Sequence, residues 1–360
     1  MEHLISKRTG EEHIGRVSTP RQSNIELLRI LAMVFVVGLH CNFSTLGYPK
    51  PSAGVYPAGM VTRVVLEGLC LVAVNVFVLI SGWFSIKASF KGAAGFIFQV
   101  LYFMLGVYLG GTVLGPYEFK LSAMADYVTL GSLPWFATYY LILYLISPIL
   151  NAAIQVYDKR TVLTITLLLF LVETRLPLAF GNGYSVLSFI TLYLTGRTLR
   201  LYYDRIKGIR GIYWLALYVG VSLLNCAIYW HCGDGWMDQR FASYSNPLVT
   251  VGAISLLLAF AKLRIGTNKI INFVAKSAFA VYLLHQEPMV GIPVFKKTVQ
   301  WIYSVYSGTA CIGGMLALIA ATFIIAVLLD QPRKWLFAQA CKYSQRSRFP
   351  QRESLLDSPQ

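Results

Sequence analysis

Long apolar stretches follow one another along most of the chain, with short polar loops between them. About ten stretches reach or approach the ~20 apolar residues that a helix needs to cross a bilayer. They lie near residues 25–45, 62–84, 92–114, 135–153, 161–179, 185–201, 211–230, 246–262, 271–291 and 308–330. Strands of a membrane barrel would instead alternate apolar and polar positions over about ten residues, and these stretches do not. We therefore predict an all-α fold, a polytopic transmembrane helical bundle of about ten spans.

Composition strengthens the membrane interpretation. Hydrophobic residues make up 56% of the chain and charged residues 13%, about half the ~25% charged residues of soluble domains. A net charge of +15 would suggest a nucleic-acid partner for a soluble protein, but basic residues also gather in the cytoplasmic loops of membrane proteins. We expect a lipid bilayer and no nucleic acid. The six cysteines form no close pair of the metal or redox type, so we expect no metal site.

Lys and Arg are unevenly shared between the loops of the two sides. One set of short loops contains twelve, namely Lys87, Lys91, Lys159, Arg160, Arg197, Arg200, Arg205, Lys207, Arg210, Lys262, Arg264 and Lys269. The other set contains six, namely Lys50, Lys120, Arg175, Arg240, Lys296 and Lys297. Both basic tails fall on the first side. The positive-inside rule therefore places both termini in the cytoplasm, which requires an even number of spans.

The same pattern divides the chain into three parts. Residues 1–22 are polar and lack the apolar core of a signal peptide, so we expect a cytoplasmic N-terminal tail. Residues 23–333 form the membrane domain. Residues 334–360 are basic and contain Ser, Gln and Pro, and we expect a cytoplasmic tail without fixed structure.

Ionisable residues inside apolar spans are costly, and each is a functional hypothesis. The main ones are Glu26, Arg29, His40, Glu67, Glu173, Lys276 and His285. Arg29 and His40 are eleven residues apart, almost three helical turns, so they should share one face about 16 Å apart along the axis. Glu67 and His285 should lie at a depth similar to that of His40. Imidazole can act as a general base near neutral pH and a carboxylate can orient it, so His40, Glu67 and His285 are the candidate catalytic residues.

Structural interpretations of these residues stay open. Arg29 and Glu26 could form an interfacial ion pair with snorkelling ends, and each histidine could serve as an interhelical hydrogen-bond partner. Glu67 could pair with Arg63, one turn earlier on the same span. Lys276 lies near an inner helix end, where it could snorkel. We attribute the abundant Tyr and Trp mainly to interfacial belts and core packing.

Four motifs stand in order along the chain. They are NIELLRILA at 24–32 followed by His40, VNVFVLISGWF at 74–84, LPWFATYYLILYLISP at 133–148, and VYLLH at 281–285. In their order, their spacing and the number of spans, they resemble the acyltransferase-3 family of bacterial membrane proteins. The resemblance covers nearly all of residues 22–335.

The resemblance implies a multi-pass O-acyltransferase of the bacterial cytoplasmic (inner) membrane. Such an O-acetyltransferase moves an acyl group, usually acetyl, from cytoplasmic acyl-CoA to a hydroxyl of an extracytoplasmic polysaccharide or lipid-linked sugar. The family's arginine and histidine correspond to Arg29 and His40. Some members carry arginines after the second motif, where this chain has lysines, which hold phosphate as point charges but not bidentately. The expected acyl-CoA-binding residues are Arg29, Lys87, Lys91, Arg197 and Arg200.

In this interpretation acetyl-CoA is a co-substrate, and no cofactor is bound. His40 either deprotonates the acceptor hydroxyl or briefly carries the acyl group. A proton-coupled transporter or flippase of the glycan export pathway would also place His and Glu at mid-membrane, and a non-catalytic scaffold of a polysaccharide-assembly complex is a second alternative. The acceptor glycan, acetyl against succinyl as the acyl group, and assembly into a homo-oligomer or a larger complex stay open.

Overall fold

The computed structural model describes residues 21–49, 58–115, 117–232 and 240–348, and all regular secondary structure in these segments is helical. The all-α prediction is therefore confirmed. The helices are α1 (Ser23–Cys41), α2 (Phe43–Leu46), α3 (Ala58–Cys70), α4 (Ala73–Phe84), α5 (Phe90–Leu114), α6 (Leu121–Val128), α7 (Trp135–Val156), α8 (Lys159–Arg175), η2 (Pro177–Gly183), α9 (Val186–Leu201), α10 (Tyr203–Ile206), α11 (Gly211–Cys232), α13 (Pro247–Ala261), α14 (Lys269–Ala275), α15 (Ala278–Gln286), α16 (Gly291–Val305) and α17 (Gly308–Arg348).

Every apolar stretch that we expected to span the membrane contains a helix, but the helices differ in length. Among the described residues, six are long and apolar enough to cross a bilayer, or seven if the bent pair α8 and η2 forms one span. The six are Ser23–Leu46, Gly59–Phe84, Phe90–Leu114, Trp135–Val156, Gly211–Cys232 and Gly308–Ser344. The structure thus supports a multi-pass membrane protein, while ten spans and two cytoplasmic termini stay predictions.

The C-terminal helix differs from its expected form. We expected the last span to end near residue 330 and residues 334–360 to lack fixed structure, but α17 continues through Pro332 to Arg348. Asp330 forms ion pairs with Arg333 at 2.6 Å and Lys334 at 2.8 Å, one turn ahead on the same helix. Such pairs stabilise a helix, here across the position where proline removes a backbone hydrogen bond. Residues 349–360 lie outside the described part of the chain.

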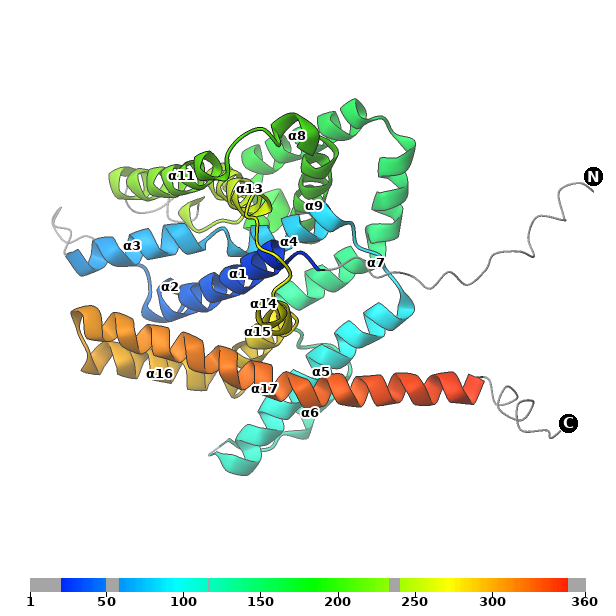
Figure 1. Ribbon diagram of the computed structural model, residues 1–360. Helices are drawn as coiled ribbons and strands as arrows, with labels where there is room; N and C mark the ends of the chain where they lie inside the picture. The colour runs from blue at the N-terminus through cyan, green and yellow to red at the C-terminus, as the bar shows by residue number, and fades with distance from the viewer. Residues whose placement is uncertain (1–20, 50–57, 116, 233–239, 349–360) are drawn as a thin grey trace, which may run out of the picture.

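Helix α1 is the centre of the bundle. Figure 1 shows it between α3 and α11 on one side and α16 and α17 on the other. Ile25 and Leu28 belong to a buried apolar cluster with α4, α9 and α13. Met33 and Val37 belong to a second cluster with α5, α15 and α17. Helix α1 therefore packs against other helices on two of its faces.

Two glycines let α4 and α9 approach closely. A Cβ atom on Gly82 would lie 2.2 Å from the Tyr193 carbonyl oxygen, and one on Gly196 would lie 2.3 Å from the Leu79 carbonyl oxygen. Small residues permit such backbone contact between helices in membranes. The glycine of the second sequence motif, Gly82, therefore has a packing role.

Candidate active site

A cavity of about 290 Å³ runs along one face of α1. Arg29, Met33, Val36 and His40 line it from α1, as expected for residues spaced by whole helical turns. The opposite walls come from α4, α5, α7, α14 and α15 and from the segments before α9 and α13. The first span thus carries the arginine and the histidine into one cavity.

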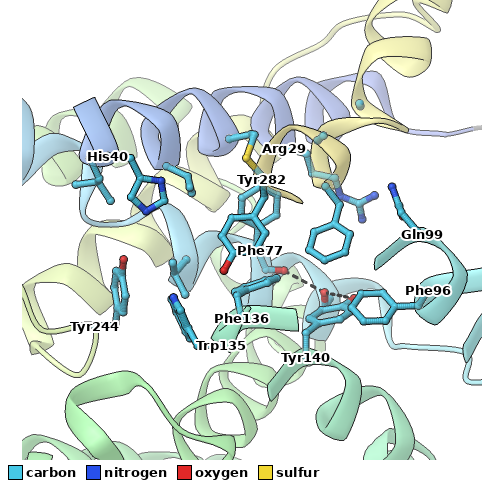
Figure 2. A pocket seen from close by; sticks show the side chains of 18 of the residues that line it. Arg29, His40, Phe77, Phe96, Gln99, Trp135, Phe136, Tyr140, Tyr244 and Tyr282 are labelled. Carbon is cyan, nitrogen blue, oxygen red and sulfur yellow. Dashed lines mark hydrogen bonds between the residues drawn. The ribbon is translucent and has the colours of Figure 1, made fainter. Parts of the chain in front are cut away.

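The cavity has different chemistry at its two ends. Figure 2 shows Arg29 and Gln99 at one end and His40, Trp135 and Tyr244 at the other. Arg29 has 31% of its side chain exposed. Tyr184, which lines the cavity with Trp135 and Tyr244, is 41% exposed. Partly exposed residues therefore mark both ends, with aromatic and apolar side chains between them.

Arg29 takes part in a small charge network. Its Nη1 atom lies 3.3 Å from Glu26 Oε1, and Arg21 Nη1 lies 3.3 Å from Glu26 Oε2. The ion pair that we considered as a structural interpretation is therefore formed. One carboxylate balances only one of the two guanidinium groups, and the exposed Lys276 lines the cavity beside them. This end of the cavity consequently keeps an excess of positive charge.

A second group of charges, from α17, lies near the same end. Asp330 Oδ1 is 3.5 Å from the amide nitrogen of Gln99, a cavity residue. Lys334, which pairs with Asp330, donates a hydrogen bond from Nζ to Ser277 Oγ at 2.7 Å. Ser277 directly follows Lys276 at the break between α14 and α15. Sequence reasoning missed this group because it assigned Lys334 to the C-terminal tail.

The two histidines are in direct contact. His40 Nδ1 lies 2.7 Å from His285 Nε2, and His285 Nδ1 lies 2.6 Å from the Val281 carbonyl oxygen. A carbonyl oxygen only accepts, so His285 Nδ1 carries hydrogen, and in a neutral ring His285 Nε2 is then the acceptor. His40 must donate from Nδ1, which leaves a lone pair on its Nε2. The Gln286 amide nitrogen makes a longer contact of 3.3 Å to His40 Nδ1.

The hydrogen bond between His40 and His285 joins α1 to α15, so the interhelical hydrogen bond that we considered as a structural role for the histidines is formed. It also fixes one tautomer of His40. In the described part of the chain, no hydrogen-bond partner occupies His40 Nε2, and His40 lines the cavity. A neutral imidazole with a free Nε2 can accept a proton or attack a carbonyl carbon. His285 does not line the cavity, so it contacts His40 from the side away from the cavity.

Glu67 does not line this cavity. Its Oε2 atom accepts hydrogen bonds from Asn42 Nδ2 at 2.9 Å and from the Phe43 backbone N–H at 3.4 Å. Asn42 Oδ1 in turn accepts from Arg63 Nε at 2.9 Å. Asn42 therefore links Glu67 and Arg63, and Glu67 fixes the corner between α1 and α2. The structure does not bring it to the His40 cavity.

The other basic residues expected at the donor site also lie outside the cavity lining. Lys87 and Lys91 are exposed where α4 leads into α5. Arg200 lies over the ring of Trp83, with its guanidinium carbon 5.3 Å from the ring centroid. Arg197 is half-buried, and its Nε atom is buried without a hydrogen-bond partner among the described residues. Of the five expected donor-binding residues, the structure places only Arg29 in the cavity wall.

Aromatic side chains form much of the cavity, and sequence reasoning did not assign them. They are Phe77, Phe96, Trp135, Phe136, Tyr140, Tyr184, Tyr244, Phe279 and Tyr282. Tyr140 and Ser81 hydroxyl groups lie 3.1 Å apart, so the serine of the second motif contacts an aromatic residue of the third. Several of these residues stand within the four motifs, which was the available signal.

Comparison with known proteins gives one match. The sequence model of a protein family, described as an acyltransferase domain, matches residues 22–331, which is most of the chain. No curated protein and no solved structure matches.

Proposed function

The chain belongs to the acyltransferase-3 family, and from this premise we propose that it is a membrane O-acyltransferase. It moves an acetyl or other short acyl group from cytoplasmic acyl-CoA to a hydroxyl of an extracytoplasmic or lipid-linked glycan. It acts as a multi-pass protein of the bacterial cytoplasmic membrane with both ends in the cytoplasm.

One observation carries this proposal: a single cavity joins Arg29 to His40 along α1. The excess positive charge around Arg29 and Lys276 suits the phosphates of CoA, which favour Arg and Lys. His40 follows Arg29 by eleven positions on the helix, about 16 Å along the axis. The pantetheine arm of CoA can extend over such a distance and carry the thioester to His40.

The arrangement of His40 suits general-base catalysis. The acceptor O–H gives its proton to His40 Nε2, and the oxygen bonds to the thioester carbon. The C–S bond then breaks, and the CoA thiolate takes the proton from His40 to leave as the thiol. In the covalent variant, Nε2 itself first bonds to the acyl carbon and CoA leaves as the thiolate. The acceptor oxygen then bonds to that carbon, the N–C bond to His40 breaks, and the acceptor proton ends on the CoA thiolate. In both routes the hydrogen bond to His285 at 2.7 Å supports the positive charge that His40 acquires.

The aromatic end of the cavity suits a sugar acceptor. The ring centroids of Trp135 and Tyr184 are 4.5 Å apart, and Tyr244 lies 5.9 Å from Trp135 and 5.0 Å from Tyr184. Tyrosine combines an apolar ring with a hydrogen-bonding hydroxyl, so this cluster can cover the C–H face of a sugar and bind its hydroxyls. Its position beside His40 would bring a sugar hydroxyl to Nε2.

Replacement of His40 tests the proposal. Purified protein in lipid nanodiscs, supplied with labelled acetyl-CoA and a lipid-linked glycan fraction, should form labelled glycan ester. His40→Ala should abolish the transfer, whereas His231→Ala, at the exposed end of α11, should leave it intact. Full transfer by His40→Ala would contradict the proposed mechanism. Movement of glycan without consumption of acetyl-CoA would favour the transporter.

A further inference from the structure

The hydroxyl group of Tyr282 is buried in the cavity wall without a hydrogen bond. Tyr282 is 5% exposed and lines the cavity. Its hydroxyl lies beside the backbone N–H of Phe136, but it reaches no partner among the described residues with hydrogen-bond geometry. A buried polar group without a partner destabilises the folded protein, and buried tyrosine hydroxyls usually find a hydrogen-bond partner. A substrate oxygen could therefore supply the acceptor that this hydroxyl lacks.

The beginning of α7 offers further donors at the same place. The first N–H groups of a helix have no partner within the helix. Pro134, the N-cap residue of α7, makes no side-chain capping bond, and the first backbone bond of this helix runs from Thr138 N–H to the Pro134 carbonyl. Trp135 and Phe136, which precede that bond, both line the cavity. The positive end of a 22-residue helix thus meets the cavity beside Tyr282.

These donors stand close to the proposed base. Tyr282 precedes His285 by three residues on α15, so the two side chains lie on neighbouring positions of one helix face. Their rings are nearly perpendicular, with centroids 6.2 Å apart. His285 in turn holds His40 through the 2.7 Å hydrogen bond. Helix α15 therefore carries both Tyr282, which lines the cavity together with His40, and His285, which orients His40.

We propose that the Tyr282 hydroxyl and the N–H groups at the start of α7 form the oxyanion-binding site of the acyl transfer. This inference rests on the proposed function. As the nucleophile bonds to the thioester carbon, the carbonyl π electrons move to oxygen, and the resulting oxyanion accepts hydrogen bonds from these donors. When the carbonyl re-forms, the C–S bond breaks and CoA leaves with the proton from His40. Tyr282 is thus a catalytic residue that donates to the developing charge.

Tyr282→Phe tests the inference because it removes only the hydroxyl. Loss of one oxyanion donor typically lowers kcat about a hundredfold or more, and we expect a fall of about that size in acetyl transfer with the KM for acetyl-CoA nearly unchanged. Thermal stability should not fall, because the hydroxyl has no partner to lose. Tyr218→Phe is the matched control: its buried hydroxyl donates to the Leu69 carbonyl at 2.7 Å, outside the cavity, so it should lose stability and keep kcat.

His40→Ala, measured in the same assay, separates the two proposals. An inactive His40→Ala together with a Tyr282→Phe enzyme of wild-type kcat would overturn the oxyanion site and leave the proposed function standing. A higher KM with unchanged kcat in Tyr282→Phe would also overturn it, since the hydroxyl would then bind the ground state. Unreduced transfer by His40→Ala would refute the proposed function itself.

Discussion

Replacing His285 by phenylalanine should slow acyl transfer without removing any group that lines the cavity. The replacement keeps an aromatic ring in contact with Phe295, whose centroid lies 5.0 Å from that of His285. It deletes the acceptor that lies 2.7 Å from His40 Nδ1. His40 then loses the partner that selects its tautomer and that supports its positive charge during the reaction.

The expected size of the effect follows from this one contact. A hydrogen bond to a charged group contributes about 1.5–3 kcal/mol, and each ~1.4 kcal/mol of barrier is a factor of ten in rate. We therefore expect kcat to fall about 10- to 150-fold in His285→Phe. The KM for acetyl-CoA should change little, because the group removed is not in the cavity wall.

The assay is steady-state release of CoA thiol in nanodiscs at saturating acceptor, with thermal unfolding measured in parallel. His285→Gln is the matched variant, since its amide oxygen can take the place of the imidazole Nε2 as acceptor for His40 Nδ1–H. It should retain a kcat within a few-fold of wild type. A fully active His285→Phe, or equal losses in the Phe and Gln variants, would refute the argument that His285 acts by accepting this hydrogen bond.

Three further replacements test other parts of the account. Arg29→Ala should raise the KM for acetyl-CoA about tenfold or more, by loss of a charge-assisted phosphate contact, with a smaller effect on kcat in the same assay; an unchanged KM would remove Arg29 from the donor site. Glu67→Ala should lower the free energy of unfolding by about 1–3 kcal/mol, because it leaves buried donors unpaired, while the protein that stays folded keeps its kcat; a specific loss of kcat would return Glu67 to catalysis. Gly82→Ala should destabilise the protein by about 1–3 kcal/mol or more through overpacking against α9. Gly106→Ala, with no atom near its added Cβ, should not destabilise it. Equal melting temperatures for the two variants would contradict the close contact of α4 and α9.

The sequence could predict what lies on one helix. Arg29 and His40 share a face of α1 because their spacing is close to three turns, and the structure shows both in one cavity. The sequence could not predict contacts between segments that are distant along the chain. His40 and His285 are 245 positions apart, and only the packing of α1 against α15 joins them. Its position in the second apolar stretch suggested that Glu67 would lie at the same depth as the two histidines and join them. In the structure, the turn from α1 into α2 instead brings Asn42 and Phe43 into hydrogen-bond contact with the Glu67 carboxylate.

The remaining site residues gave weak signals for physical reasons. Tyr and Trp residues occur in interfacial belts and in packed cores as well as in cavities. Residue type alone therefore could not identify Trp135, Tyr244 and Tyr282 as cavity residues. Lys276 resembled a snorkelling residue, and its place at the cavity depends on the break between α14 and α15. The end of α17 was misplaced because the basic, Ser-, Gln- and Pro-containing composition of residues 334–360 indicated a tail without fixed structure. The helix instead continues to Arg348, with ion pairs from Asp330 to Arg333 and Lys334 across Pro332.

The central claim is that the acyl group passes along α1 from the arginine end of the cavity to the histidine end. One-sided acyl transfer in sealed proteoliposomes tests it most directly, with labelled acetyl-CoA on one face only and a membrane-impermeant glycan acceptor on the other. Protein molecules whose Arg29 end faces the acetyl-CoA should label the acceptor across the intact membrane, and His40→Ala should not. Transfer that requires donor and acceptor on the same face would contradict the account.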